Sequence, residues 1–364
     1  MDAPSPRPAK PQSILRKRFR KFRSLKRGYY AFTFLLVCYL LSFVLPLLVN
    51  NEALVVRYRG QFFFPVWRFH AASEFGVQGI GEPDYRELKG TLASRAEGDW
   101  VLMPLYPYGP NESLLDLPGY PPHPPSSQHI LGTDDRARDV FARLVYGFNI
   151  SVTFALLVLT LGYLFGVAVG ALLGYFGGKL DILGQRLIEI WSSLPFLYTI
   201  IIVSSIIVPR YVTGRNELLQ PGFWLLIFIL AAFDWMGITF YVRGEFYREK
   251  ARDYVGAAIC VGASEPAIIF KHILPNALTP VVTFVPFALV ANISALVALD
   301  FLGFGLPAPT PSWGELIGQG MANLTKWWLV FFPLGAVFLT LLLVVFIGEA
   351  IREAFDPKEF SRLR

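Results

Sequence analysis

The stretch "YVGAAICVGASEPAIIFKHILPN", residues 254–276, lies between two long apolar runs of the chain. Gly262 and Pro275 predict that it forms two short helices joined by a turn, because glycine weakens a helix and the residue before a proline avoids helical angles. Ser264 is expected to cap the second helix, which Pro275 should end. An ordered element at a membrane edge favours one of two roles. It fills a groove on another protein, or it rests on the lipid headgroups as an amphipathic pair.

The composition is that of a membrane protein. Hydrophobic residues make up 54% of the chain and charged residues only 16%, whereas about a quarter of a soluble chain is charged. The formal charge is +6, and much of it lies in residues 7–28, directly before the first apolar run. Such a tail is typical of the cytoplasmic side and is attracted to anionic lipids. No folded nucleic-acid recognition module accompanies it, so we expect the lipid bilayer as its partner and no nucleic acid.

The apolar runs predict six membrane spans. The first, residues 29–49, is long enough to cross about 30 Å of hydrocarbon, and it is too long for the core of a signal peptide. It is therefore a retained anchor whose N-terminus is cytoplasmic. Six spans return the C-terminus to the same side, where the basic loop 243–276 also lies. The five further apolar runs are 149–174, 183–208, 222–242, 278–300 and 328–350.

These runs divide the chain into segments. We predict a basic cytoplasmic tail, a first span, an extracytoplasmic segment, a transmembrane domain with the remaining spans, and a second cytoplasmic tail, at residues 1–28, 29–49, 50–147, 148–350 and 351–364. The extracytoplasmic segment contains aromatic patches and a proline-rich stretch, and prolines at that density favour extended backbone. It is either a loosely ordered loop or, as we favour, a small lobe packed on its own aromatic residues.

Four glycines in the second span follow one another at intervals of four residues: Gly162, Gly166, Gly170 and Gly174. This spacing places them on one face of a helix, where a neighbouring backbone can approach closely. A chance scatter of small residues is the alternative, and a close helix–helix contact is the better interpretation.

Motifs of catalysis are missing from the sequence. It contains no GxxxxGK[ST] phosphate loop, no HExxH and no clustered metal ligands, so we expect no enzyme, no metal site and no bound cofactor. Its two cysteines, Cys38 and Cys260, lie at different depths, which argues against a disulfide.

Transport is the function that these absences leave, and it would be driven either by an ion gradient or by a partner that hydrolyses ATP. An ion-coupled carrier needs ionisable groups within the spans. Only Asp234 lies near mid-membrane, and no cationic partner for it is evident.

The stretch 254–276 resembles the EAA loop of ABC importer permeases. Gly256, Ala257 and Ala258 stand at the EAA positions, Gly262 follows after three residues, and His272–Pro275 reads as the closing H-I-L-P. The ending is similar to that of the dipeptide/oligopeptide branch, as are "HILGTDDRARDVFARLVYGFNIS" (129–151) and "LDFLGFGLPAPTPSWGELIGQG" (299–320). The long external segment resembles that of the Yej-type microcin C/oligopeptide importers.

This resemblance implies an all-α, six-span permease with the type I ABC importer fold and an external insertion between its first two helices. It implies a complex in the bacterial inner membrane that also contains a second permease, two ABC ATPase domains that bind the ATP, and an extracytoplasmic solute-binding protein. The substrate would be a peptide or a peptide-like compound. A self-sufficient ion-coupled carrier, or a scaffold or receptor without transport, are the other classes.

The resemblance also assigns candidate site residues. The ATPase-coupling set is Gly256, Ala257, Ala258, Gly262, His272, Leu274 and Pro275, although a glutamate usually stands at the first of these positions. We expect a second set to contact the binding protein: Leu131, Gly132, Thr133, Asp134, Arg138, Asp139 and Trp313. The alternative for that segment is local, with Asp134 and Asp135 capping the helix that follows. Asp234 is expected to face the translocation path or, equally, to hydrogen-bond a neighbouring helix.

Overall fold

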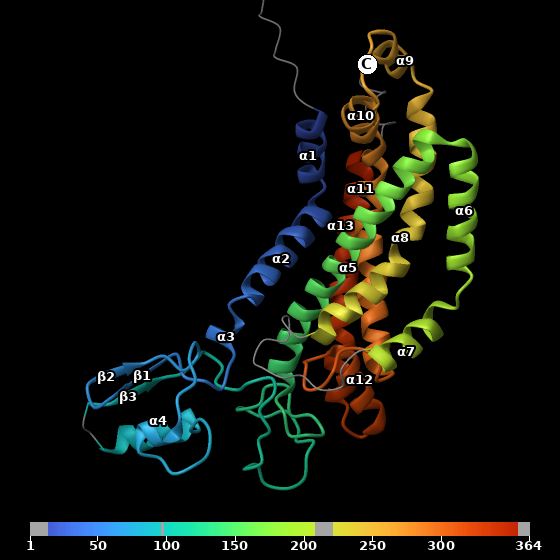
Figure 1. Ribbon diagram of the computed structural model, residues 1–364. Coiled ribbons are helices and arrows are strands. Elements are labelled where there is room, and N and C mark those ends of the chain that lie inside the picture. The colour runs from blue at the N-terminus through green and yellow to red at the C-terminus, as the bar shows by residue number, and fades with distance from the viewer. Residues whose placement is uncertain (1–13, 96–97, 208–220, 356–364) are drawn as a thin grey trace, which may run out of the picture.

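The computed structural model describes residues 14–95, 98–207 and 221–355 and is mostly helical (Figure 1). The first part of the basic tail, all but the last residue of the connection predicted to be external at 209–221, and the end of the C-terminal tail lie outside the described residues. Four described helices are long and apolar enough to cross a membrane. They are α5 (Val140–Phe176), α8 (Pro221–Lys250), α11 (Leu274–Phe301) and α13 (Trp328–Phe355). They contain four of the predicted spans.

The third predicted span, residues 183–208, is not a straight helix in the structure. Two helices, α6 (Gly178–Ser192) and α7 (Phe196–Ile207), meet at a bend of 75°. Pro195 lies at the break, and the residue before a proline is driven out of helical angles. If the bent pair is one span, the described residues contain five candidate spans.

The first predicted span is a 17-residue helix, α2 (Lys26–Ser42), followed after a kink by the single turn α3 (Leu45–Leu48). At 1.5 Å per residue, α2 is about 26 Å long, slightly less than the thickness of the hydrocarbon. The described residues therefore do not establish α2 as a span, and the count of six spans remains a prediction. A basic amphipathic helix, α1 (Ile14–Ser24), precedes it.

The close helix–helix contact predicted from the glycine spacing is confirmed, and it lies between α5 and α8. A Cβ added at Gly166 would lie 2.4 Å from Ile238 Cγ2, and one at Gly170 would lie 2.7 Å from the carbonyl oxygen of Thr239. Distances this short leave no room for any side chain, so the two backbones touch along the seam.

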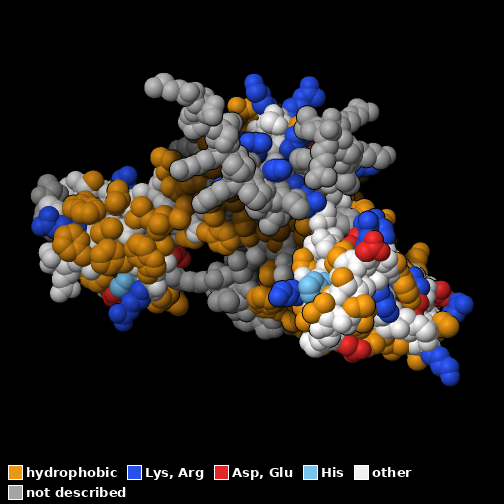
Figure 2. All heavy atoms as spheres, turned by 90° about the horizontal axis from the view of Figure 1, so that it is seen from above, with side chains coloured by type: hydrophobic (Ala, Val, Ile, Leu, Met, Phe, Trp, Pro, Cys, Tyr) orange, Lys and Arg blue, Asp and Glu red, His pale blue; other side chains and the backbone are white. Residues whose placement is uncertain are grey.

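The segment between the first two predicted spans folds into a small lobe beside the bundle, which confirms the predicted alternative of a packed lobe (Figures 1 and 2). The lobe also holds a three-stranded antiparallel sheet that the all-helical expectation did not include. Its strands are β1 (Val55–Tyr58), β2 (Gln61–Phe63) and β3 (Trp100–Leu102), in the order β2-β1-β3. The hairpin between β1 and β2 turns at Arg59 and Gly60, which both have positive φ, as a two-residue hairpin turn requires.

The core of the lobe is apolar and lies on one face of the sheet. Helix α4 (Tyr85–Arg95) packs Leu88 and Leu92 against Val56 and Val101. A single 3₁₀ turn, Ala72–Phe75, adds Phe75 to this cluster.

We expect Gly170→Ala to destabilise the chain, because the added methyl group meets the backbone of α8. Overpacking of this kind costs about 1–3 kcal/mol. The control is Gly244→Ala on α8 itself, where an added Cβ meets no described atom within 4 Å. Thermal unfolding of the purified chain in detergent compares the two, and an equal melting temperature would contradict the close seam.

Candidate functional site

Helix α8 continues beyond the predicted span to Lys250, and the stretch predicted to couple to an ATPase follows its end (Figure 1). Helix α9 (Asp253–Cys260) is followed by a turn in which Gly262 has φ +83°, and a short helix, α10 (Glu265–Ala267), begins after Ser264. Two helices joined by a glycine turn are thus confirmed. Ser264 has the extended backbone of a cap, but its side chain makes no capping hydrogen bond.

The predicted helix end at Pro275 is wrong. A π-helical turn, Ile268–Ile273, runs directly into α11, and Pro275 lies in the first turn of that helix. Proline is tolerated there because the first turn needs no N–H donor. The wider π turn also removes the ordinary ladder that the proline ring would disturb.

Helix α9, the Gly262 turn, α10 and the π turn together form a helical hairpin, residues 253–273, which is held to the bundle by apolar side chains. Val255, Ile268 and Ile273 are almost fully buried and pack with Val242 and Phe246 of α8. Only Val255 stands between two exposed residues, whereas the chain neighbours of Ile268 and Ile273 are half-buried or exposed, so no simple alternation marks this anchor in the sequence.

Polar contacts tie the same hairpin to both neighbouring helices. Tyr254 donates a hydrogen bond of 2.8 Å to Glu249 and accepts one of 3.1 Å from Asn276. Asn276 also donates to the carbonyl oxygen of His272 at 3.0 Å. The hairpin is therefore fixed at its base.

The tip of the hairpin is exposed, and most of its side chains are small or apolar, with Ser264 and Glu265 as exposed polar residues. Of the predicted coupling residues, Gly256, Ala257, Gly262 and Pro275 are exposed, and Ala258, His272 and Leu274 are half-buried. The larger apolar side chains Ile259 and Val261 are 55% and 89% exposed. A Cβ at Gly256 would meet no described atom within 4 Å, so glycine is not required there by the packing of this chain.

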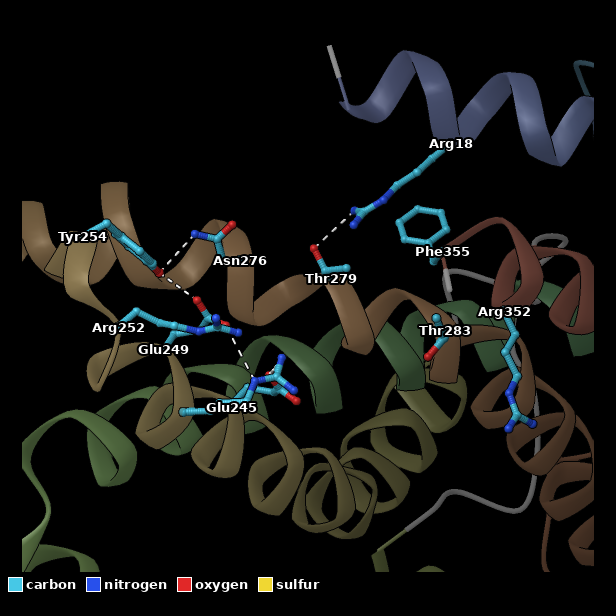
Figure 3. A pocket seen from close by; sticks show the side chains of 11 residues that line it. Arg18, Glu245, Glu249, Arg252, Tyr254, Asn276, Thr279, Thr283, Arg352 and Phe355 are labelled. Atoms are coloured by element: carbon cyan, nitrogen blue, oxygen red, sulfur yellow. Dashed lines mark hydrogen bonds and ion pairs between the residues drawn. The ribbon is translucent and has the colours of Figure 1, made fainter. Parts of the chain in front are cut away.

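A pocket of about 670 Å³ opens beside the base of the hairpin (Figure 3). Its lining includes four arginines and two glutamates, contributed by α1, α8, the start of α9 and α13: Arg18, Arg248, Arg252, Arg352, Glu245 and Glu249. Arg18 donates a hydrogen bond of 3.3 Å to Thr279 on α11. The excess of arginine makes this end of the bundle polar and positively charged.

The opposite end of the bundle is organised by a buried ionic network. Asp134 accepts hydrogen bonds from the backbone and side chain of Arg138, at 2.8 and 2.7 Å. Arg138 and the fully buried Arg143 of α5 both reach Glu315 on α12 (Trp313–Ala322). Burial alone would lower the pKa of Arg138, but Asp134 and Glu315 hold that pKa above its usual value. The network joins the loop before α5 to α12.

Asp139, rather than Asp134 or Asp135, caps α5. Its side chain accepts a hydrogen bond of 2.9 Å from the backbone N–H of Ala142. It also pairs with His129 at 2.9 Å and accepts a hydrogen bond of 2.7 Å from Tyr106. Burial, together with the Asp139 carboxylate, raises the pKa of the Tyr106 phenol.

Two tryptophans pack at this end of the bundle and donate hydrogen bonds to backbone carbonyl groups. Trp313 donates to the carbonyl oxygen of Leu144 at 3.0 Å, and Trp328 donates to that of Thr133 at 3.2 Å. Gly132 has φ +77°, and a Cβ there would lie 2.7 Å from the carbonyl oxygen of His123. The motifs before α5 and after α11 therefore fit together in one packed unit.

Most of the predicted docking residues are buried in this unit. Leu131 is half-buried, whereas Gly132, Thr133, Asp134, Arg138, Asp139 and Trp313 are buried. Their side chains support the local structure, and the exposed positions of the same loop are Asp135 and Arg136. Contact with a binding protein remains a prediction.

Asp234 lies in the α5–α8 seam. A Cβ added at Gly162 would be 2.6 Å from Asp234 Oδ2. On the neighbouring helix α11, the side-chain amide of Asn292 interacts with the Asp234 carboxyl. Asp234 Oδ2 and Asn292 Nδ2 are nevertheless buried without a hydrogen bond among the described residues. The carboxyl thus faces a neighbouring helix, and its role in a pathway stays a prediction.

Residues 166–360 match the family model described as the binding-protein-dependent transport system inner membrane component. The chain belongs to this family. It is 41% identical to the inner membrane ABC transporter permease protein YejE of Escherichia coli (strain K12), over 94% of this chain and 96% of that protein.

Two further relatives differ in the length of the match. The chain is 36% identical to the peptidoglycan transport system permease protein YejE of Agrobacterium fabrum, over 95% of this chain and 94% of that protein. It is 34% identical to the dipeptide transport system permease protein DppC of Bacillus subtilis, over 65% of this chain and 70% of that protein. The likeness to the two YejE proteins thus extends over nearly the whole permease.

Arg143 and Glu315 are the site residues that the sequence analysis missed. Glu315 stands three residues after Ser312, whose side chain accepts a hydrogen bond from its backbone N–H. This Ser-x-x-Glu spacing is a helix-start signal. No local pattern pairs Glu315 with Arg143, which lies 172 residues away in sequence.

We expect Glu315→Gln to lower the free energy of unfolding by about 3–5 kcal/mol, because it leaves the buried Arg143 without its closest counter-charge. The control is Glu353→Gln, which removes an exposed pair with Lys21 and should cost no more than about 1 kcal/mol. Thermal unfolding in detergent measures both variants. Similar losses would show that the network contributes no more than a surface ion pair.

Proposed function

We propose that this inner-membrane permease forms half of the translocation pathway of an ATP-driven importer for peptides or peptide-like compounds. The observation that carries the proposal is the anchored hairpin at the end of α8, with its exposed face of small residues, in a chain that resembles the YejE permeases over nearly its whole length. The names of its relatives include peptidoglycan and dipeptide transport, which supports a substrate built from peptides.

The partners follow from this role. A second permease completes the pathway, and two ABC ATPase domains bind and hydrolyse ATP, since this chain has no phosphate-loop motif. The hairpin sits on an ATPase domain, which puts this end of the bundle and both termini in the cytoplasm. The lobe then lies outside the cell membrane, where a solute-binding protein delivers the substrate.

The hairpin is suited to transmit force because it is fixed at its base and small at its tip. The buried Val255, Ile268 and Ile273 join it to α8 and α11, so a push on the tip moves both helices. Gly256, Ala257 and the Gly262 turn would fit a groove of the ATPase domain by shape more than by charge.

The binding protein is proposed to dock near the ionic network at the other end. The buried residues Asp134, Arg138 and Asp139 would position the loop, and its exposed residues Asp135 and Arg136 would make the contact.

Coupling is tested by a pair of glycine variants. Gly262→Ala forces a side chain into left-handed backbone angles, at a cost of about 1–2 kcal/mol, and distorts the hairpin tip. Gly256→Ala adds the same methyl group to a helix with open space around it. We expect only Gly262→Ala to lower substrate-driven uptake per ATP hydrolysed by the reconstituted complex. Equal uptake by both variants would refute the hairpin as the coupling element.

A single cysteine at Ala258, in a chain lacking Cys38 and Cys260, tests the contact directly. It should form a crosslink with the ATPase domain in an assembled and active complex. A cysteine at Ser94, in the lobe, is the control and should form none. No crosslink from Ala258 in an active complex would favour a hairpin resting on lipid.

Asp234→Asn tests whether the carboxyl takes part in transport. The substitution keeps the hydrogen-bonding capacity and removes the charge. If Asp234 meets a peptide amine or a basic side chain, uptake of basic peptides should fall relative to neutral peptides. Unchanged uptake of both kinds would mean that the residue only joins the helices.

A further inference from the structure

The sheet of the lobe has a second face that no described part of the chain covers. Residues paired across the strands alternate between the two faces, and the register places Phe62, Arg57 and Trp100 side by side on this outer face. Leu102 lies on the same face beside Val55. Phe62, Trp100 and Leu102 are 58%, 40% and 49% exposed, so the face is an open apolar surface.

Aromatic residues extend this surface beyond β2. Phe64, Trp67 and Phe69 are all exposed, and the rings of Phe64 and Trp67 contact each other at 6.1 Å between centroids. Exposed arginines stand among them, Arg57 on the face itself and Arg68 next to Trp67. Large aromatic side chains mixed with arginine are typical of the membrane–water interface.

The outer face of the sheet is turned towards the end of the molecule into which the long apolar helices extend (Figure 1). Helix α4 covers the inner face of the sheet, and Figure 1 shows α4 on the side of the sheet that is turned away from the helices of the bundle. Figure 2 views the molecule from the side of α9, and hydrophobic side chains gather on the part of the lobe seen from there. A protein that approached the lobe from the water beyond it would meet α4 first.

The lobe is also held close to the end of the first span. Only six residues separate the end of α3 at Leu48 from the start of β1 at Val55, and Val49 forms a bridge with Tyr106. The last part of α2 and the residues after it are apolar and exposed, with Leu40, Leu41 and Phe43 all more than half exposed. The aromatic face therefore lies near a second exposed apolar surface, that of α2 and the residues after it.

We propose that the outer face of the lobe rests in the headgroup region of the lipid bilayer, so that the lobe is a second membrane anchor of this chain. The aromatic side chains enter the interface, and Arg57 and Arg68 lie beside anionic headgroups. The lobe is thereby fixed in height and orientation relative to the spans.

The test uses the full-length chain without Cys38 and Cys260, with a single cysteine at Phe62 or, as a second position, at Leu102. Each cysteine carries an environment-sensitive fluorophore, and the chain is placed in nanodiscs of phosphatidylcholine and phosphatidylglycerol. A lipid with a nitroxide near its headgroup should remove most of the fluorescence at both positions. Iodide in the water should remove little.

The matched control is a cysteine at Ser94 on the exposed side of α4, where iodide should quench and the nitroxide lipid should not. Quenching of all three positions by iodide alone would overturn the proposal. So would protection of Phe62 and Leu102 that arises only after the second permease or the binding protein is added, without quenching by the nitroxide lipid. That result would assign the face to a protein partner.

Discussion

The backbone contact between α5 and α8 is the constraint on which the rest of the permease depends. Glycines at four-residue intervals let the two helices touch along their length, and the bulk of Ile238, Val242 and Phe246 fills the space that the missing side chains leave. Because α8 is held in this way, its extension to Lys250 projects from the bundle as a firm support for the hairpin. The hairpin can then be small and exposed at its tip, since the buried side chains at its base stabilise it.

The two ends of the bundle use different physical means. At the hairpin end, buried aliphatic side chains anchor an element whose tip is apolar and accessible, which suits a partner that binds by shape. At the other end, charged groups are taken out of water and paired with one another through Asp134, Arg138 and Glu315. Buried ion pairs depend strongly on their geometry. They therefore hold the loop before α5 and α12 in one arrangement.

The sequence allowed the helices, the glycine seam and the hairpin to be predicted, because each depends on a local pattern of spacing. It did not reveal that the chain stays helical through Pro275, since the π turn that joins α10 to α11 has no such pattern. The strands of the lobe are three or four residues long, too short for their alternation to be distinguished from an aromatic cluster. The ionic network was missed for another reason. Arg143 and Glu315 meet only through the fold, and a charged residue in an apolar helix shows no partner in the sequence.

Helix α5 connects these features. It contains 37 residues, so it is about 55 Å long at 1.5 Å per residue, well beyond the thickness of the hydrocarbon. Arg143 and the cap Asp139 lie at one end, the glycine seam occupies its second half, and the last glycine of the seam, Gly174, meets Phe246 near the base of the hairpin at the other end. A continuous helix cannot shorten to absorb a displacement at its start. Any movement of the ionic network must therefore tilt or slide α5 against α8, where the close backbones leave few ways to respond. The seam thus connects the two ends of the permease through packed backbone.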